Sequence, residues 1–168
     1  VLYRTNAQSR AIEDAFRRRN IPYRLIGAVR FYDRREIRDI MAYLKLVANP
    51  ADDEAFRRAV NVPKRGLGDA TITLLVERAQ REGVPLLTIA SRTDVVAELR
   101  PAARTALADF VSLVQRLQAA AVDSAVDELL RDLAASIKYA DHLRAEGPEG
   151  QERIENVREL IAGAAEVV

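Results

Sequence analysis

From residue 28 onward the chain carries apolar residues at helical spacing, and short breaks with Asn, Gly or Pro interrupt the pattern repeatedly. Residues three and four apart lie on one face of a helix, so each apolar stripe predicts a helix with one buried face. The breaks at residues 49–50, 61–68, 83–85 and 147–150 are the predicted connections, because Pro and Gly stop helices. The chain is therefore expected to be mainly α-helical, with inward-facing residues that include Ile37, Ile40, Met41, Leu44, Val47, Phe56, Leu75, Leu107, Phe110, Leu130 and Ile154.

Residues 1–27 have a different pattern, in which two β-prone runs flank a helical one. Residues 1–3 and 23–26 are short apolar runs rich in strand formers, and Ser9 to Arg19 carries apolar residues at helical spacing. This segment is expected to be a βαβ piece, which cannot close a sheet by itself. A chain that begins inside a predicted strand, at Val rather than Met, is expected to be a fragment of a larger protein.

The composition excludes several classes of chemistry and of location. The chain has no Cys, so disulfides, thiolate metal sites and a Cys nucleophile are excluded. His142 is the one histidine, so a His-based metal cluster or catalytic pair is excluded as well. No uncharged apolar run approaches the ~18 residues that a membrane span needs, and no signal pattern precedes the first helix. We therefore expect a cytoplasmic protein with no membrane partner and no metal site.

The net charge of +1 hides an asymmetry along the chain. Residues 1–66 hold 15 Lys/Arg and 8 Asp/Glu, a balance of +7, whereas residues 67–168 hold 11 and 17, a balance of −6. A basic part beside an acidic part suggests a surface that faces a polyanion on one side only. The alternative is that the Arg residues lie on ordinary solvated helix faces, because only clustering in space would make the charge matter.

Tyr3 and Arg4 stand at the C-terminal end of the first predicted strand. Ligand sites in open α/β sheets lie at those strand ends, so both residues are well placed to meet a ligand. Tyr3 offers a face on which a base could stack, and Arg4 offers a fixed cation for a phosphate. The alternative is an ordinary turn from strand to helix, which the residues alone leave open.

A basic pair followed by alternating glycines precedes another predicted helix. Gly66 and Gly68 allow the backbone to approach a partner closely. Lys64 and Arg65 supply cations, and the first N–H groups of the helix, which Asp69 is expected to cap, favour an anion. Together these features suit a sequence-independent contact with one DNA phosphate strand, in the manner of a helix-hairpin-helix loop. The alternative is a plain helix–helix connection that needs Gly for its turn.

Several stretches resemble, in order along the chain, parts of the UvrD/PcrA/Rep helicases of superfamily 1. Residues 2–10, LYRTNAQSR, resemble motif IV of that family. Residues 21–23 and 30–39, IPY and RFYDRREIRD, resemble the segment that leaves the second motor domain, and residues 42–46 (AYLKL), 49–50 and 52–53 continue the resemblance. Residues 61–68, NVPKRGLG, resemble the GIG motif with Leu67 in place of Ile, and residues 153–157, RIENV, resemble the run near the return to the motor domain. Matches in this order are far more specific than any one of them.

The resemblance implies a division of the chain into parts of two domains. The family has two RecA-like motor domains, 1A and 2A, each with an inserted helical domain, 1B and 2B. Residues 1–27 are expected to be a partial 2A domain, and residues 28–168 the helical 2B domain with its last helix returning towards 2A. The implied fold is mainly α, a helical 2B-type domain preceded by a small βαβ piece of a RecA-like motor domain.

The resemblance also implies roles for residues of both parts. In relatives the motif IV Tyr stacks on adenine and the following Arg reaches the γ-phosphate, which would make Tyr3 and Arg4 ATP-binding residues of the parent protein. The GIG loop of relatives contacts duplex DNA ahead of the fork. In this chain the corresponding DNA-binding residues would be Lys64, Arg65, Gly66, Gly68 and Thr71.

The implied parent protein is an ATP-dependent 3′-to-5′ DNA helicase of DNA repair or replication, with ATP and Mg²⁺ as its cofactors. Its 2B domain would contact duplex DNA at a junction with single-stranded DNA, regulate unwinding and offer surfaces to protein partners, in the cytoplasm at the nucleoid. No GxxxxGK[ST] phosphate loop and no complete catalytic set occur in this chain, so we expect no cofactor and no ATPase activity for it alone. The alternative function is a non-catalytic helical module that binds proteins through an apolar groove.

Overall fold

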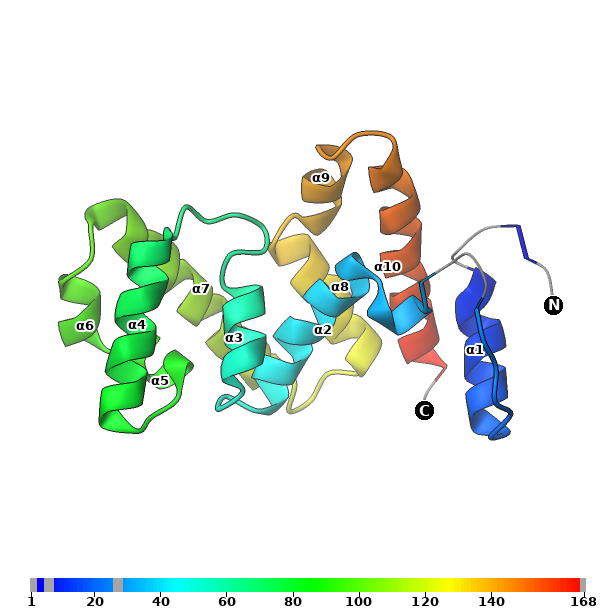
Figure 1. Ribbon diagram of the computed structural model, residues 1–168, viewed down its shortest axis with the longest axis horizontal. Helices are drawn as coiled ribbons and strands as arrows, with labels where there is room; N and C mark the ends of the chain where they lie inside the picture. Colours follow the sequence, from blue (N-terminus) through cyan, green and yellow to red (C-terminus); the bar gives the residue numbers. More distant parts are fainter. Residues whose placement is uncertain (1–2, 5–7, 26–28, 167–168) are drawn as a thin grey trace. The chain divides into compact units, whose positions relative to one another are not determined.

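The computed structural model describes residues 3–4, 8–25 and 29–166 of the chain (Figure 1). These residues form α-helices and a short 3-10 helix, and none of them belongs to a β-strand. The expectation of a mainly α-helical fold is therefore confirmed. Within the described part, no helix is both long and apolar enough to cross a membrane.

The chain folds as two compact units. The first unit comprises Val1–Arg38 and Ala125–Val168, and the second unit comprises Asp39–Ser124. The first unit is thus built from segments that lie far apart in the sequence. The predicted domain boundary after residue 27 stays a prediction.

The main helix packing of the first unit involves α10. Helix α10 (Glu149–Ala165) packs against α8 (Val126–Ser136) and α9 (Tyr139–Arg144), and α1 (Ser9–Arg18) packs against the 3-10 helix η2 (Phe31–Asp33) (Figure 1). The apolar stripes predicted for α8 and α10 lie inside this unit. Its buried apolar residues include Phe31, Ile37, Leu129, Leu130, Leu133, Tyr139, Leu143, Ile154, Val157 and Leu160.

The second unit is centred on a short helix, α5 (Leu86–Ala90). Helix α5 contacts α3, α4, α6 and α7 and is buried along most of its length. Phe110 stands at the centre of an aromatic cluster, with ring centroids 5.5 Å from Phe56 and 6.0 Å from Tyr43, both in edge-on geometry. The other helices of this unit are α2 (Arg35–Ala48, of which the second unit holds the part from Asp39), α3 (Asp53–Ala59), α4 (Asp69–Glu82), α6 (Thr93–Ala97) and α7 (Pro101–Ala120).

The predicted βαβ piece appears in the structure only as its helix, α1. Residues 23–25 lie in the second predicted strand but form no strand, and the same holds for Tyr3 in the first. Val1, Leu2 and the residues from Ile26 to Ala28 lie outside the described residues. A β-prone run becomes a strand only when a neighbouring strand accepts its backbone hydrogen bonds, and β-propensity alone supplies none.

Helix α1 buries polar residues where an apolar stripe was expected. Ser9, Arg10 and Glu13 are buried. Ile12 and Phe16, which the helical spacing within Ser9 to Arg19 places on one apolar face, are only half-buried. The polar residues are satisfied inside the first unit. The Glu13 carboxylate accepts hydrogen bonds from the Phe31 N–H (3.2 Å) and the Tyr23 hydroxyl (3.0 Å), while the Arg10 guanidinium donates to Asp14 and Glu159 at 3.0 Å. Helix α1 is therefore held by polar contacts more than by apolar burial.

Two helix starts differ from the sequence-based expectation. Gly68, and not Asp69, is the N-cap of α4, with φ −73° and ψ 167°, and Asp69 is the first residue of the helix. The apolar spacing from Glu98 to Ala120 predicts one long helix, but this helix, α7, begins at Pro101, and residues 93–97 form the separate helix α6. Pro at a first helical position lacks only an N–H that the helix cannot use. Gly83 ends α4 in the left-handed conformation, as the sequence indicates.

Candidate nucleic-acid interface

The basic and glycine-containing stretch connects α3 to α4 within the second unit (Figure 1). We call residues 61–68 the glycine loop. Its alternating glycines lie on the surface: Gly66 and Gly68 are exposed, and a Cβ atom built at each would meet nothing within 4 Å. Leu67 between them is 3% exposed and belongs to the core. The loop therefore presents backbone outward at two positions and anchors itself through the apolar side chain between them.

The two glycines serve different backbone needs. Gly66 has φ +74°, a left-handed conformation that other residues adopt only at a cost. Gly68 has an ordinary φ, and its open surroundings leave room for a partner at the backbone. Only Gly66 is therefore required by the turn itself.

The start of α4 adds a positive end to the glycine loop. No side chain caps α4, and the Gly68 carbonyl accepts from the N–H groups of Thr71 (3.0 Å) and Ile72 (3.2 Å). The first N–H groups of a helix have no carbonyl partner within the helix, and they favour an anion. Asp69 and Ala70 are exposed here, and the Asp69 carboxylate competes with an outside anion for the same positive end. Thr71 is half-exposed one position further on.

The basic pair divides between the surface and the interior. Lys64 is exposed, so its ammonium group is accessible to a phosphate. Arg65 is half-buried, and its guanidinium Nη1 donates to the carbonyl oxygens of Val60 (3.0 Å) and Ala59 (3.2 Å), with those of Val62 and Pro63 at 3.4 and 3.5 Å. The sequence predicts two equivalent cations, whereas the structure turns one of them into the loop.

Two residues that the sequence analysis did not single out support the loop from inside. The Tyr43 hydroxyl accepts a hydrogen bond from Arg65 Nη2 (2.7 Å) and donates to the Val62 carbonyl (2.5 Å). Asn61 donates to the Leu67 carbonyl (2.5 Å) and accepts from the Arg65 N–H (3.3 Å). Asn61 starts the stretch that resembles the GIG motif, and Tyr43 belongs to the AYLKL stretch. Those resemblances could have pointed to both.

Tyr43 remains a hydrogen-bond donor because its hydroxyl stays protonated. Burial raises the pKa of Tyr43 above its ordinary value, although the nearby Arg65 guanidinium favours the phenolate. The Arg65 guanidinium carbon also lies 5.8 Å from the Tyr43 ring centroid and 5.1 Å from that of Phe110, within cation–π range. Arg65 is thus enclosed by the aromatic cluster and the loop backbone.

Tyr3 and Arg4, the predicted ATP-binding residues, belong to the first unit. Tyr3 is half-buried and Arg4 is exposed, and the Arg4 N–H donates to the Gln8 side chain at 3.0 Å. Residues 5–7, which complete the motif IV resemblance, lie outside the described residues. The roles of Tyr3 with adenine and of Arg4 with phosphate stay predictions.

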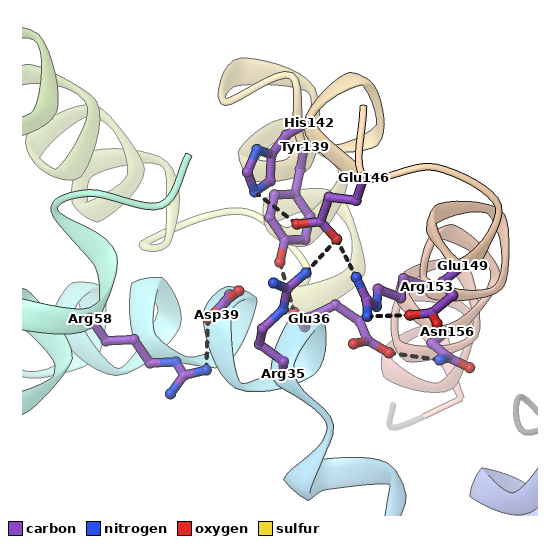
Figure 2. A network of polar contacts seen from close by, with 10 residues as sticks. All are labelled: Arg35, Glu36, Asp39, Arg58, Tyr139, His142, Glu146, Glu149, Arg153 and Asn156. Carbon is purple, nitrogen blue, oxygen red and sulfur yellow. Dashed lines mark hydrogen bonds and ion pairs between the residues drawn. The ribbon is translucent and has the colours of Figure 1, made fainter. Parts of the chain in front are cut away.

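A buried polar cluster joins two stretches of the first unit that resemble the segments leaving and re-entering the motor domain. Arg34 donates to Asn156 Oδ1 at 2.9 Å. Asn156 Nδ2 in turn donates to Glu36 Oε1 at 2.7 Å, which Figure 2 shows. Arg34 also donates to the Ser9 hydroxyl at 2.9 Å. We call these four residues, each less than 9% exposed, the exit–return cluster. Asn156 bridges a cation and a carboxylate that are both buried.

The carboxylate of Glu146 forms ion pairs with two arginines of the first unit. Glu146 accepts hydrogen bonds from Arg35 and Arg153, and Arg153 also pairs with Glu149 at 2.9 Å (Figure 2). Partial desolvation opposes ionisation of Glu146, yet the hydrogen bonds from both arginines hold its pKa below the ordinary value. His142 Nε2 lies 3.7 Å from the same carboxylate. The contacts bring the start of α2 together with the end of α9 and the start of α10.

Among the described residues, no group of three or more His, Cys, Asp or Glu side chains is placed to hold a metal ion. Arg34, Glu36, Arg65 and Glu146 are instead used in hydrogen bonds within each unit. At the glycine loop, the exposed residues Lys64, Gly66 and Gly68 offer a cation and accessible backbone to a partner.

Known proteins match the sequence over almost the whole length of the chain. A family model described as the UvrD-like helicase C-terminal domain matches residues 1–168. The chain is 37% identical over 163 residues to the ATP-dependent DNA helicase PcrA of Bacillus subtilis, covering 96% of this chain and 22% of that protein. It is 38% identical over 175 residues to DNA helicase II of Haemophilus influenzae, covering 100% of this chain and 23% of that protein. DNA helicase II of Escherichia coli is 36% identical over 165 residues, with 96% and 22% covered.

Proposed function

The chain belongs to the UvrD-like helicase C-terminal domain family, and from this premise we propose that it grips duplex DNA within an ATP-dependent 3′-to-5′ helicase. The chain spans less than a quarter of the length of the relatives it matches. The unwinding activity therefore belongs to the whole protein, and the part proposed for this chain is DNA contact and regulation. The helical domain holds the duplex ahead of the junction with single-stranded DNA and turns relative to the motor.

The observation that carries this proposal is the glycine loop with its outward backbone. Gly66 and Gly68 are exposed around the buried Leu67, Lys64 is exposed beside them, and the uncapped start of α4 follows. Backbone amides and one mobile cation can hold a phosphate strand without reading its bases. The proposed contact set is Lys64, Gly66, Gly68 and Thr71, while Arg65 is turned into the loop.

The ATP site of the parent protein is proposed to use the other unit. Tyr3 stacks on adenine and Arg4 contacts the γ-phosphate, with Mg²⁺ bound by residues of the motor that lie outside this sequence. No phosphate loop occurs in these 168 residues, so the chain alone is expected to hydrolyse no ATP. An ATPase assay on the purified chain checks this, and turnover that exceeds the background would contradict it.

Titration of a fluorescent forked DNA, with duplex and single-stranded arms, tests the DNA contact. Fluorescence anisotropy at two or more salt concentrations gives the affinity and its salt dependence. Each phosphate neutralised contributes about 0.9 to the slope of log K against log salt. We expect binding that weakens with salt, and a slope that falls by about 0.9 in Lys64→Gln.

The matched control is Arg81→Gln, which removes the same charge from an exposed position at the other end of α4. Position 81 lies about 20 Å along the helix from Gly68 at 1.5 Å per residue. Its slope is expected to equal that of the unchanged chain. Equal slopes of log K against log salt for the unchanged chain, Lys64→Gln and Arg81→Gln would show that Lys64 does not contact a phosphate. Absence of fork binding at low salt, together with capture of a defined protein partner, would support the protein-interaction module instead.

A further inference from the structure

We infer that Arg65 is a positioning residue, which holds the glycine loop so that its amides face outward, and does not itself contact a phosphate. The functional role inferred for Arg65 rests on the proposed DNA contact. Its effect on the conformation of the glycine loop can be tested without DNA. It separates the roles of two adjacent basic residues that the sequence presents as a pair.

The first support is the set of backbone acceptors around the guanidinium. Arg65 Nη1 lies within hydrogen-bond distance of carbonyl oxygens at the C-terminal end of α3, those of Ala59 and Val60. The last carbonyls of a helix lack N–H partners within it, and a cation there also meets the negative end of the helix dipole. The same nitrogen reaches the carbonyls of Val62 and Pro63 at longer distance. One side chain thus fixes the path of the chain from the helix end into the loop.

The second support is the link to the core through Tyr43. Arg65 Nη2 donates to the Tyr43 hydroxyl at 2.7 Å, and Tyr43, which is 0% exposed, donates to the Val62 carbonyl. The loop backbone, the guanidinium and a fully buried ring therefore form a closed set of hydrogen bonds. Because Phe110 packs on both groups, Arg65 cannot turn outward without opening this set.

The third support is the chemistry of the side chain. A guanidinium has donors in a rigid planar fork and can serve several carbonyls at once, whereas a lysine ammonium is a compact point charge on a flexible stem. A phosphate contact accepts Lys and Arg alike as cations, but the arrangement around Arg65 requires the fork. When the loop samples other conformations, the apparent affinity falls in proportion to the fraction that stays competent.

Three variants separate positioning from phosphate contact. Arg65→Lys keeps the charge and removes the fork, Tyr43→Phe removes one hydroxyl from a fully buried ring and changes no charge, and Lys64→Gln removes a charge from the exposed neighbour. Two measurements apply to each variant of the 168-residue chain. The Gly66 and Gly68 amide resonances are recorded without DNA, and forked DNA is titrated by anisotropy at several salt concentrations.

The expected result has two parts. Arg65→Lys and Tyr43→Phe shift both glycine resonances and weaken fork binding about tenfold and about threefold, as loss of charged and neutral hydrogen bonds implies, while the salt slope is unchanged. Lys64→Gln leaves the resonances in place and lowers the slope by about 0.9. Circular dichroism at the same temperature verifies that each variant is folded.

The inference is overturned if Arg65→Lys binds the fork like the unchanged chain and keeps the glycine resonances, because charge alone would then suffice. If Arg65→Lys does not fold, the Tyr43→Phe variant provides the test. Unchanged Gly66 and Gly68 amide resonances in Tyr43→Phe would then overturn the inference. If the unchanged chain binds no fork at low salt, the proposed function fails by itself. The glycine resonances then still show whether Arg65 sets the loop geometry.

Discussion

The glycine loop of the second unit and the exit–return cluster of the first are both organised by an arginine that faces inward, but they use it differently. Arg65 donates to backbone carbonyls within six residues of itself and to one side chain, Tyr43. Arg34 donates to side chains 25 and 122 positions away, those of Ser9 and Asn156. One arginine therefore shapes a local surface, and the other joins distant segments. Damage to the loop is expected to reduce DNA affinity, and damage to the cluster to reduce stability.

The largest effect on stability is expected for Asn156→Ala. Removal of the bridging amide leaves the buried Arg34 and Glu36 without the partner they share, so the free energy of unfolding is expected to fall by about 3–4 kcal/mol. Urea denaturation measures this. The exposed neighbour Glu155→Ala is the control and should change the free energy by about 0.5 kcal/mol or less. At temperatures where both variants are folded, fork affinity should be equal; a selective loss in Asn156→Ala would break the contrast between the two regions.

A smaller loss of stability is expected at the anchor of the glycine loop. Leu67→Ala removes a buried side chain, and the free energy of unfolding is expected to fall by about 2–3 kcal/mol. The control is Leu67→Ile, which restores the residue typical of the GIG motif and should cost less than about 1.5 kcal/mol. Fork affinity should fall with Leu67→Ala and persist with Leu67→Ile. A Leu67→Ala chain that binds like the original would show that the anchor does not shape the contact.

Gly66 and Gly68 separate the effect of backbone strain from that of DNA contact within the glycine loop. Only Gly66 has a positive φ, whereas a Cβ atom at either position would meet nothing within 4 Å. Gly66→Ala places a side chain at φ +74° and is expected to cost about 1 kcal/mol of unfolding free energy. Gly68→Ala meets no steric obstacle, and its cost as a cap change is about 0.5 kcal/mol. Both are expected to weaken fork binding, Gly68→Ala because its methyl group stands where the strand approaches. Unchanged fork affinity in Gly68→Ala would argue against a close backbone contact.

A small effect on stability that depends on pH is expected at Glu146 in the first unit. Since the folded chain holds the pKa of Glu146 below its ordinary value, the ionised carboxylate stabilises the fold above about pH 4.3, the unfolded value. That contribution is lost as the pH falls through the lower folded pKa. Glu146→Gln should therefore cost less than about 1 kcal/mol at pH 7, and its difference from the unchanged chain should vanish in acid. Thermal melts across pH 3–7 measure this; a constant difference would contradict it.

The helices could be predicted from the sequence because their signals are local. Apolar spacing located α4 and its end at Gly83, and the cluster of Pro and Gly located the glycine loop. The face of α2 was predicted less well: Met41 and Leu44 are only half-buried, while Tyr43 and Leu46 are fully buried. Apolar positions on neighbouring faces of one helix satisfy the same spacing. Only the packing of the second unit decides which of them is covered.

The site could be predicted in part for a related reason. Exposed glycines beside an exposed lysine follow from the motif, but the inward turn of Arg65 depends on Tyr43, far outside the motif. The bridge from Arg34 through Asn156 spans more than a hundred positions, and no local pattern specifies it. Tyr3 and residues 23–25 form no strand although their composition favours one, because a strand needs a second strand as its partner. Contacts between distant residues are what a single sequence does not display.

The burial of Leu67 has a consequence for how the domain responds to heat. Surface loops commonly open at temperatures where their domain is still folded, because little apolar area holds them down. The glycine loop cannot open in this way without pulling a core side chain into water. Warming should therefore release DNA at the same temperature at which the helices of the second unit melt, in one cooperative step. Until that temperature is reached, the loop keeps its shape.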